Sequence, residues 1–422
     1  MKVLVVPCGT EIGLEINRSL KGVKNLKLLG LNSISDFSSV VYDNFYEGAP
    51  FVDSPNFINY LREFVSENQV THIIPAHDSA ALLISKHAQD FGAGVTVVSS
   101  NYETNNICRS KKLTYNTLKS IICVPHCFSA LNEVTSANFP VFVKPDIGQG
   151  SKGARKVTSY EELAQVDFDS NVVTEYLPGD EFTVDCFTDQ NGKLLYTGPR
   201  KRNRIQNGIA VSTVTISNRN NEFREISEKI NSSISFKGAW FFQVKENSAG
   251  NLVLLEVATR IAGSMSTNRV KGVNFTELSL YIHNGVNVTV NPNSYDVHLE
   301  RSLSNKYKLN IDYKHVYVDF DDCLIIDGKV NEELVAFLFK AINDGCRIYL
   351  VTRHENDLTK SLEKYRLAGL FDEIFHITDK SPKSEVMHHK DAIFIDDSFA
   401  ERDEVLKCGI PCFSVDCVEA LI

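Results

Sequence analysis

The stretch that decides the fold is Val141-Phe-Val-Lys-Pro-Asp-Ile-Gly-Gln-Gly-Ser-Lys-Gly153. Its apolar first half predicts a β-strand that ends at Lys144 and Pro145, and a glycine-rich loop follows. Glycine lets the backbone N–H groups approach a ligand closely, and Lys144 and Lys152 add positive charge, so the loop suits phosphate groups. It contains neither a P-loop string nor the dinucleotide-binding Gly-x-Gly-x-x-Gly string. Taken alone, a plain glycine-rich hairpin is an alternative.

The size and composition are those of a globular multidomain protein. With 422 residues, of which 43% are hydrophobic and 23% charged, the chain should hold two or three domains with sizeable cores. A formal net charge of -9 argues against a nucleic-acid partner. The ten cysteines form no Cys-x-x-Cys pair, which predicts reduced thiols in a cytoplasmic protein. No apolar run is long enough for a signal peptide or a membrane span, so no membrane partner is expected.

Residues 1–100 predict a Rossmann-like, doubly wound α/β sheet. Short apolar strands alternate with helical patterns in a βαβ rhythm, and the expected strands are 2–7, 26–31, 71–75 and 94–98. His77 and Asp78 follow a strand end, where ligands gather in such sheets. A helix cap at Asp78 or Ser79 explains them at least as well.

The middle of the chain changes to longer, alternating strands. One helix is expected over 102–118. Residues 171–185 predict a strand that ends at Glu175, a turn, and a new strand that begins at Glu181.

Two segments near residue 250 predict a β-hairpin. Residues 240–245 and 252–260 flank the turn Asn247-Ser-Ala-Gly250. Pairing would bring Gln243 and Glu256 to the same face of neighbouring strands, where their oxygens could hold Mg²⁺. The alternative is a pair of solvent-facing polar residues.

In this order, residues 1 to about 300 resemble the ATP-grasp superfamily, in the branch of the carbamoyl-phosphate synthase large subunit and D-alanine–D-alanine ligase. The resemblance implies a Rossmann-like pre-ATP-grasp domain at 1–100 and an ATP-grasp domain at 101–298. It implies ATP and Mg²⁺ as cofactors, with Mn²⁺ as a substitute, and a ligase that joins a small-molecule carboxylate to an amine through an acyl phosphate. The positions that it assigns to ATP are Lys112, Lys144, Gly148, Gly150, Ser151, Gly153, Glu175, Tyr176, Leu177 and Glu181.

By the same resemblance, Gln243 and Glu256 are the Mg²⁺ ligands and Arg260 is the catalytic arginine of the family's Glu-x-Asn-x-Arg string. The chain departs from that string at Ala258, whose side chain cannot coordinate a metal, and this puts the second Mg²⁺ in doubt. Arginines that ATP does not use should bind an anionic acceptor, because their planar fork suits carboxylate and phosphate oxygens. These are Arg200, Arg202, Arg204 and Arg269; for the first three, an exposed loop without a ligand is about as good an interpretation.

A separate unit is expected at 312–422, after a segment without periodicity at 287–308. Its strand patterns end in polar residues, and such strand ends meet at one edge of a parallel sheet. The residues concerned are Asp319, Asp321, Thr352, Lys383, Asp396 and Asp397.

This unit resembles the haloacid dehalogenase-like (HAD) phosphatase superfamily. The resemblance implies that Asp319 is the nucleophile and Asp321 the general acid and base. Thr352 and Lys383 would contact the phosphoryl group, with Lys380 as a substitute for Lys383. The implied Mg²⁺ ligands are Asp319, Asp396, Asp397 and the backbone carbonyl of Asp321.

Between Leu324 and Thr352 there is room for one helix, so the domain should be capless and its site open to a bulky substrate or covered by the first two domains. His354 lies next to this site; an exposed loop histidine is expected there, and a substrate contact is the alternative.

The sequence therefore predicts a bifunctional, cytoplasmic, α/β and α+β multidomain enzyme: a ligase joined to a phosphatase that acts on a related phosphorylated metabolite or sugar, with a homodimer as an open option. Two alternatives stand beside it. One is a small-molecule kinase that only transfers the γ-phosphate. The other is an ATP-binding regulatory module, weakened by Ala258, attached to an active phosphatase.

Overall fold

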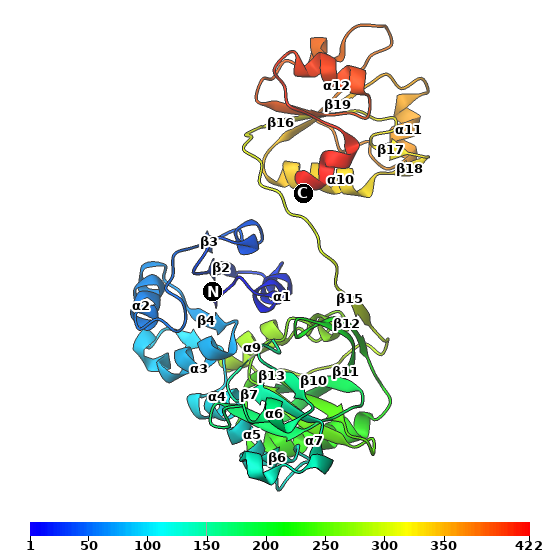
Figure 1. Ribbon diagram of the computed structural model, residues 1–422. Helices are drawn as coiled ribbons and strands as arrows, with labels where there is room; N and C mark the ends of the chain where they lie inside the picture. Colours follow the sequence, from blue (N-terminus) through cyan, green and yellow to red (C-terminus); the bar gives the residue numbers. More distant parts are fainter. Residues whose placement is uncertain (149) are drawn as a thin grey trace. The chain divides into compact units, whose positions relative to one another are not determined.

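A computed structural model gives the structure of residues 1–148 and 150–422 (Figure 1). The chain divides into two compact units: unit 1 is Met1–Leu303 and unit 2 is Ser304–Ile422. Each unit has an apolar core of its own. In the part of the chain that the structure describes, no helix has the length and apolar character that a membrane crossing needs.

Unit 1 begins with a parallel sheet of strand order β3-β2-β1-β4-β5. Its strands are β1 (Lys2–Val6), β2 (Lys27–Leu31), β3 (Phe45–Tyr46), β4 (His72–Pro75) and β5 (Thr96–Val97). The helices between them are α1 (Glu11–Leu20), α2 (Phe57–Glu67) and α3 (Asp78–Lys86). Strand β1 is buried from Val3 onward, as a short β-branched strand covered on both faces should be. The α/β sheet expected in this region is therefore present.

The single helix expected after this sheet is in fact two helices, α4 (Tyr102–Arg109) and α5 (Lys111–Leu118). Ser110 breaks the helix with an extended backbone, and its hydroxyl accepts the Leu113 N–H at 3.1 Å as the N-cap of α5. The same hydroxyl donates to the Asp146 carboxylate at 2.9 Å. The break thus ties α5 to the start of the glycine-rich loop.

Two antiparallel sheets complete most of unit 1, one of order β6-β9-β7-β8 and one of order β14-β13-β10-β11-β12-β15. The smaller consists of β6 (Cys127–Phe128), β7 (Val141–Pro145), β8 (Arg155–Val157) and β9 (Asn171–Glu175). The larger consists of β10 (Glu181–Thr188), β11 (Leu194–Gln206), β12 (Ile209–Thr215), β13 (Gly238–Glu246), β14 (Leu252–Ala258) and β15 (His298–Glu300). The helices of this part are α6 (Tyr160–Leu163), α7 (Asn220–Ser233), α8 (Ser266–Arg269) and α9 (Phe275–His283).

The hairpin expected near residue 250 is confirmed: β13 and β14 pair antiparallel, with Gln243 opposite Glu256. The segment 287–308, expected to be a connection, contributes strand β15, which pairs with β12. Unit 1 therefore continues to Leu303.

One apolar core joins the first sheet to the rest of unit 1. Side chains of β1 and α1 belong to the same cluster as Phe187, Phe241 and Phe275. Packing thus crosses residue 100, where the sequence predicts a domain boundary, and the separation of 1–100 from 101–298 stays a prediction.

Unit 2 is a parallel sheet of order β20-β19-β16-β21-β22 (Figure 1). Its strands are β16 (His315–Val318), β19 (Arg347–Thr352), β20 (Glu373–His376), β21 (Ala392–Ile395) and β22 (Cys412–Phe413). Its helices are α10 (Glu332–Asn343), α11 (Leu358–Lys364) and α12 (Phe399–Leu406). The described residues between β16 and β19 form α10 and a small hairpin of β17 (Ile325–Ile326) and β18 (Lys329–Val330). The sheet edge after β16 therefore carries no inserted domain in this stretch.

Candidate functional site

A cleft of about 680 Å³ opens between the two antiparallel sheets of unit 1. Lys144 lines it from β7, Glu181 from β10, and Gln243 and Glu256 from the β13–β14 hairpin. The glycine-rich loop contributes Gly148, Gly150 and Ser151 to its wall. The structure therefore brings together most of the residues to which the sequence assigns ATP and Mg²⁺; Gly153 is not part of this lining.

An adjoining hollow of about 400 Å³ shares Lys144 and Glu181 with the cleft. Glu175, Tyr176 and Leu177, the predicted hinge, lie along its edge. Pro125, Phe142 and Leu255 add apolar side chains to its wall, and Thr174 and Lys245 complete the lining. A pocket with apolar side chains beside a charged cleft is suited to an aromatic base attached to a polar chain.

Lys144 is a buried ammonium group in this cleft. Its Nζ donates to the Tyr115 hydroxyl at 2.7 Å and to the Leu255 carbonyl at 3.2 Å. Burial, followed by repulsion from Lys111, lowers the pKa of Lys144 to about 8. A cation held in so little water is prepared to interact strongly with an anionic ligand.

The lysine of α5 that reaches the cleft is Lys111, and the expectation for Lys112 is wrong. Lys111 lines the cleft, and burial lowers its pKa. Lys112 instead donates to the carbonyls of Phe168 at 2.8 Å and Asp169 at 2.7 Å. The helix break at Ser110, which the sequence analysis missed, sets which of the two neighbours faces the ligand.

Arg202 links two predicted ligand residues within the cleft. It forms an ion pair with Glu181 and donates to Oε1 of Gln243 at 2.9 Å. It also donates to the Gly208 carbonyl at 2.8 Å, while its Nε has no partner among the described residues. Arg202 therefore lies in the predicted nucleotide cleft, not in a separate acceptor pocket.

Gly208 lets the β11–β12 turn approach the glycine-rich loop. It has a φ of +76°, and a Cβ at this position would lie 2.2 Å from the carbonyl carbon of Gly150. Only glycine fits so close to another backbone. The turn therefore supports the loop that covers the cleft.

Gln243 and Glu256 are the residues of unit 1 that fit a divalent cation. They face each other across the hairpin and both line the cleft. Glu256 has neither a hydrogen bond nor an ion pair with any described residue, so its carboxylate oxygens are available to a metal ion. Ala258 packs in the apolar core with Phe241 and adds no donor. The donor set suits one Mg²⁺ better than two.

A third hollow, of about 430 Å³, shares Glu256, Lys111 and part of the loop with the cleft. Arg260 and Asp78 lie in its wall as a bidentate ion pair, with N–O distances of 2.8 and 2.9 Å. Arg109, which the sequence analysis did not single out, lines the same hollow and donates to the Gly148 carbonyl at 2.9 Å. This hollow therefore places two arginines and Lys111 beside Glu256.

Of the two interpretations of the residues after β4, the helix cap at Asp78 or Ser79 is wrong, whereas Asp78 lines the third hollow, so a role at a ligand site stays a prediction. Helix α3 is capped by His77, whose Nδ1 accepts the Ser79 N–H at 3.2 Å. Asp78 is therefore free of the capping role and pairs with Arg260, whose charge lowers the pKa of Asp78 despite the opposing effect of burial.

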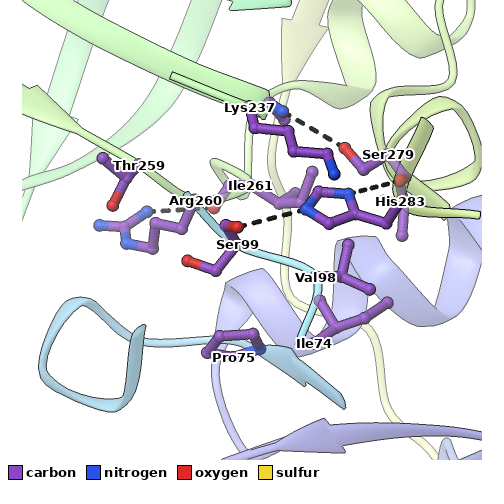
Figure 2. Close-up of a pocket in the computed structure, with 12 residues that line it drawn as sticks. Ile74, Pro75, Val98, Ser99, Lys237, Thr259, Arg260, Ile261, Ser279 and His283 are labelled. Atoms are coloured by element: carbon purple, nitrogen blue, oxygen red, sulfur yellow. Dashed lines mark hydrogen bonds between the residues drawn. The ribbon is translucent and has the colours of Figure 1, made fainter. Parts of the chain in front are cut away.

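A further hollow, of about 360 Å³, also has Arg260 in its wall. Figure 2 shows the residues that line it. His283 lies between the carbonyls of Ser279, at 2.8 Å, and Ser99, at 3.2 Å, and burial lowers its pKa. The hollow contains none of the residues assigned to ATP, and apolar side chains such as Ile74, Val98 and Ile261 make up much of its wall.

The remaining arginines do not form the predicted acceptor site. They lie in β11, not in an exposed loop, apart from Arg269 in α8. Arg200 is buried and pairs bidentately with Asp185, at 2.9 and 3.1 Å. Arg204 is exposed and pairs with Glu300 at 2.9 Å. Arg269 pairs with Glu15 of α1 at 2.6 Å.

In unit 2, a buried charge cluster lies where β16 and β21 end. The Lys383 ammonium is 2.7 Å from Oδ1 of Asp319 and 2.7 Å from Oδ2 of Asp396. Burial, opposed by Lys383, raises the pKa of Asp319 to about 7, and burial also raises the pKa of Asp396. Lys383 therefore belongs to this cluster, whereas Lys380 is exposed.

The carboxylates of this cluster fit a hard cation. Oxygens of Asp319, Asp396 and Asp397 all lie within 4.8 Å of one another. Asp396 is fully buried and Asp397 exposed, so the group opens towards solvent on one side. Three carboxylates in this arrangement suit Mg²⁺. Thr352 is buried at the end of β19, the strand that pairs with β16.

His354 is buried, and the expectation of an exposed loop histidine is wrong. Its Nδ1 lies 2.9 and 3.0 Å from the two carboxylate oxygens of Asp321. Its backbone N–H donates to Oγ1 of Thr352 at 3.1 Å. A histidine two residues after the hydroxyl at a strand end was the available sequence signal.

Comparison with known proteins relates unit 1 to ATP-grasp enzymes. A family model described as ATP-grasp in the biosynthetic pathway with Ter operon matches residues 167–303. The vancomycin/teicoplanin A-type resistance protein VanA of Enterococcus faecium is 30% identical over 128 residues, which cover 28% of this chain and 37% of VanA. The chain thus spans little more than a third of the length of that relative.

Two solved structures share the fold. One is the biotin carboxylase domain of 2-oxoglutarate carboxylase from Hydrogenobacter thermophilus, a dimer in complex with ADP, its magnesium salt and bicarbonate. It matches with a TM-score of 0.59 and 16% identity, and the match covers 69% of this chain and 71% of that one. N5-carboxyaminoimidazole synthetase from Staphylococcus aureus matches with a TM-score of 0.54 and 17% identity, covering 68% and 78%. At such identities the likeness shows the fold alone. Together with the family match, it supports the ATP-grasp superfamily for unit 1.

Proposed function

We propose that unit 1 is an ATP-dependent ligase that joins a carboxylate to an amine through an acyl phosphate. The observation that carries this proposal is the pairing of Gln243 with Glu256 in the cleft that also holds Lys144 and the glycine-rich loop. Phosphoryl transfer from a nucleoside triphosphate requires a phosphate-binding loop, cations and hard oxygen ligands for a metal ion. This cleft combines all three. The adjoining apolar hollow then takes the adenine.

In the proposed reaction, Lys144 and Lys111 bind the triphosphate beneath the loop, and Glu181 binds the ribose. Mg²⁺, held by Gln243 and Glu256, would neutralise charge on the phosphates. A carboxylate oxygen of the acceptor attacks the γ-phosphorus, the bond to the β-phosphate oxygen breaks, and ADP leaves. The amine then attacks the acyl carbon and inorganic phosphate departs, while a proton leaves the amine nitrogen.

The third hollow is the proposed acceptor site, because it shares Glu256 and Lys111 with the cleft. Arg109 is the cation that we assign to the acceptor carboxylate. Arg260 is assigned a supporting role, since its guanidinium already pairs with Asp78. These assignments replace the acceptor roles that the sequence suggested for Arg200, Arg204 and Arg269.

An ADP-release screen against pooled carboxylates and amines tests the ligase proposal. Glu256→Gln should abolish ADP release, whereas Glu225→Gln on the exposed face of α7 should leave it unchanged. ADP release that needs both a carboxylate and an amine supports the ligase. Release that needs no amine would instead support the kinase, and nucleotide binding without turnover would support the regulatory module.

For unit 2, we propose a Mg²⁺-dependent phosphatase of the HAD type. The Asp319–Lys383–Asp396 cluster at the strand ends favours this function. A carboxylate oxygen of Asp319 attacks phosphorus and the ester oxygen leaves with a proton from Asp321. Water then attacks the aspartyl phosphate and gives a proton to Asp321, which releases inorganic phosphate and restores Asp319.

Hydrolysis of a phosphomonoester such as 4-nitrophenyl phosphate tests this second proposal. Asp319→Asn should abolish the activity, and Asp344→Asn, at the exposed end of α10, should not change it. We further propose that the natural substrate is the phosphorylated acceptor or product of unit 1. A ligase product whose mass is the same with Asp319→Asn as with the unaltered protein would rule out that coupling.

A further inference from the structure

The imidazole of His354 connects two polar side chains in unit 2. Its Nδ1 contacts both carboxylate oxygens of Asp321, at 2.9 and 3.0 Å, and its Nε2 lies 2.8 Å from Oγ of Ser361 in α11. The side chain of His354 is 8% exposed, whereas that of Asp321 is 52% exposed. The buried imidazole of His354 thus holds the half-exposed carboxylate of Asp321.

These partners suit the neutral tautomer of His354 that carries its hydrogen on Nδ1. When the Asp321 carboxylate is ionised it can only accept hydrogen bonds, so Nδ1 then carries the hydrogen that is donated to Asp321. The lone pair on Nε2 then accepts the hydroxyl hydrogen of Ser361. Both ring nitrogens are satisfied without a charge on the buried ring, which is the arrangement with the smallest desolvation cost.

The position of the ring is fixed by its surroundings. The backbone N–H of His354 donates to Thr352, and its carbonyl accepts from Nε2 of His376 at 2.8 Å. The ring meets Phe320 edge to face, with 4.9 Å between centroids. Asp321 has no such support: in the described part of the chain, His354 supplies every hydrogen bond to its side chain.

We propose that His354 is a positioning residue that holds the Asp321 carboxyl in the orientation needed to protonate the leaving oxygen, with Ser361 fixing the required tautomer. The inference rests on the phosphatase function proposed for unit 2. A half-exposed aspartate without a fixed neighbour would populate several rotamers, and proton transfer depends on alignment. His354 itself exchanges no proton with the substrate.

The leaving group of the substrate distinguishes positioning from general stabilisation. An alkyl phosphate needs a proton on its leaving oxygen, whereas 4-nitrophenolate leaves without one. His354→Ala should therefore lower kcat for an alkyl phosphate by about 10- to 100-fold, with little change in KM, and lower kcat for 4-nitrophenyl phosphate less than about threefold. His354→Asn, whose amide can still donate to Asp321, should recover most of the loss, and Asp321→Ala should remove the effect of His354→Ala. Equal losses on both substrates, or no recovery with asparagine, would overturn the proposal.

Imidazole ¹⁵N NMR of the full chain tests the hydrogen-bond assignment without any hydrolysis. The unaltered protein should show His354 as the neutral Nδ1–H tautomer, with an Nδ1–H that is protected from exchange. Asp321→Ala should remove that protection, and Ser361→Ala should mix in the other tautomer. A neutral Nε2–H tautomer in the unaltered protein would overturn the proposal whatever the activity. The spectra could show the expected tautomer while the protein shows no Asp319-dependent hydrolysis. That result would contradict the phosphatase function and the positioning role, but not the contact between His354 and Asp321.

Discussion

In unit 1, the Lys144 ammonium donates to the Tyr115 hydroxyl at 2.7 Å, at the point where the apolar hollow meets the charged cleft. The Tyr115 hydroxyl in turn donates a hydrogen bond to the Leu255 carbonyl at 2.7 Å. Lys144 therefore has a fixed position before any ligand binds, and its charge is poorly solvated. Binding energy need not be used to order this side chain.

The pKa of Lys144, about 8 in the free protein, predicts pH-dependent nucleotide binding. Below this pH the ammonium is charged and attracts ATP; above it, binding must first add a proton. The Kd for ATP should therefore rise about tenfold between about pH 7 and about pH 9 by titration calorimetry. Lys144→Gln should bind ATP weakly and equally at both pH values.

Lys111 offers a matched variant for this measurement. Its charge is the second cause of the lowered pKa of Lys144, after burial. Lys111→Gln should therefore raise the pKa of Lys144 and move the loss of affinity to higher pH, besides weakening binding overall. An unchanged pH profile in Lys111→Gln would show that the two ammonium groups are not coupled.

Arg202 should affect the nucleotide more than the acceptor, because it joins Glu181 to Gln243 inside the cleft. We expect Arg202→Met to raise the KM for ATP about tenfold or more and to change the KM for the carboxylate less than about threefold. Steady-state kinetics with each substrate varied in turn measure both values. A larger change for the carboxylate would restore Arg202 to the acceptor site that the sequence suggested.

Arg200 should matter for stability. Removing the guanidinium would leave Asp185 buried without its bidentate partner, so Arg200→Met should lower the free energy of unfolding by about 3 to 5 kcal/mol. The double variant Arg200→Met with Asp185→Leu should recover much of this loss, because no buried charge remains. Denaturant unfolding followed by tryptophan fluorescence suits this test, since Trp240, in unit 1, is the single tryptophan of the chain.

The raised pKa of Asp319 predicts that removing this carboxylate stabilises unit 2 but abolishes its activity. Its folded pKa, about 7, lies above the ordinary value of 3.8, so the stability linked to this carboxyl is complete below about pH 4 and is lost as the pH rises through 7. In metal-free protein above pH 7, Asp319→Asn should therefore raise the Tm of unit 2 while abolishing phosphoester hydrolysis. Mg²⁺ should raise the Tm of the unaltered protein, and should do so much less in this variant; scanning calorimetry with and without EDTA measures both.

The sequence was sufficient for those parts of the fold that local pattern controls. The β13–β14 hairpin could be predicted because two alternating strands flank a short turn. The register shift between Gln243 and Val244, which places Gln243 opposite Glu256, is not visible in that local pattern. Likewise, Asp319 and Asp396 each follow an apolar strand, and parallel strands bring such ends to one edge.

Residue roles that depend on tertiary packing could not be predicted in this way. Arg200 and Arg202 lie in the same strand. Arg200 nevertheless forms a buried ion pair with Asp185, whereas Arg202 pairs with Glu181 in the cleft. The choice of Lys111 over Lys112 depends on a helix break that Asp146, more than thirty residues later, helps to stabilise. His354 is buried because α11 and Phe320 cover it, and a loop sequence does not reveal such neighbours.

The ion pairs Arg260–Asp78 and Arg269–Glu15 join residues 182 and 254 positions apart along the chain. A gene fragment that ends near residue 100 would expose apolar surface and leave the Asp78 and Glu15 carboxylates without their counterions. Recombination, truncation or domain grafting should therefore tolerate a cut after Leu303 far better than one near residue 100. The first sheet should therefore fold only together with the proposed nucleotide cleft, whereas unit 2 should be exchangeable as a separate part.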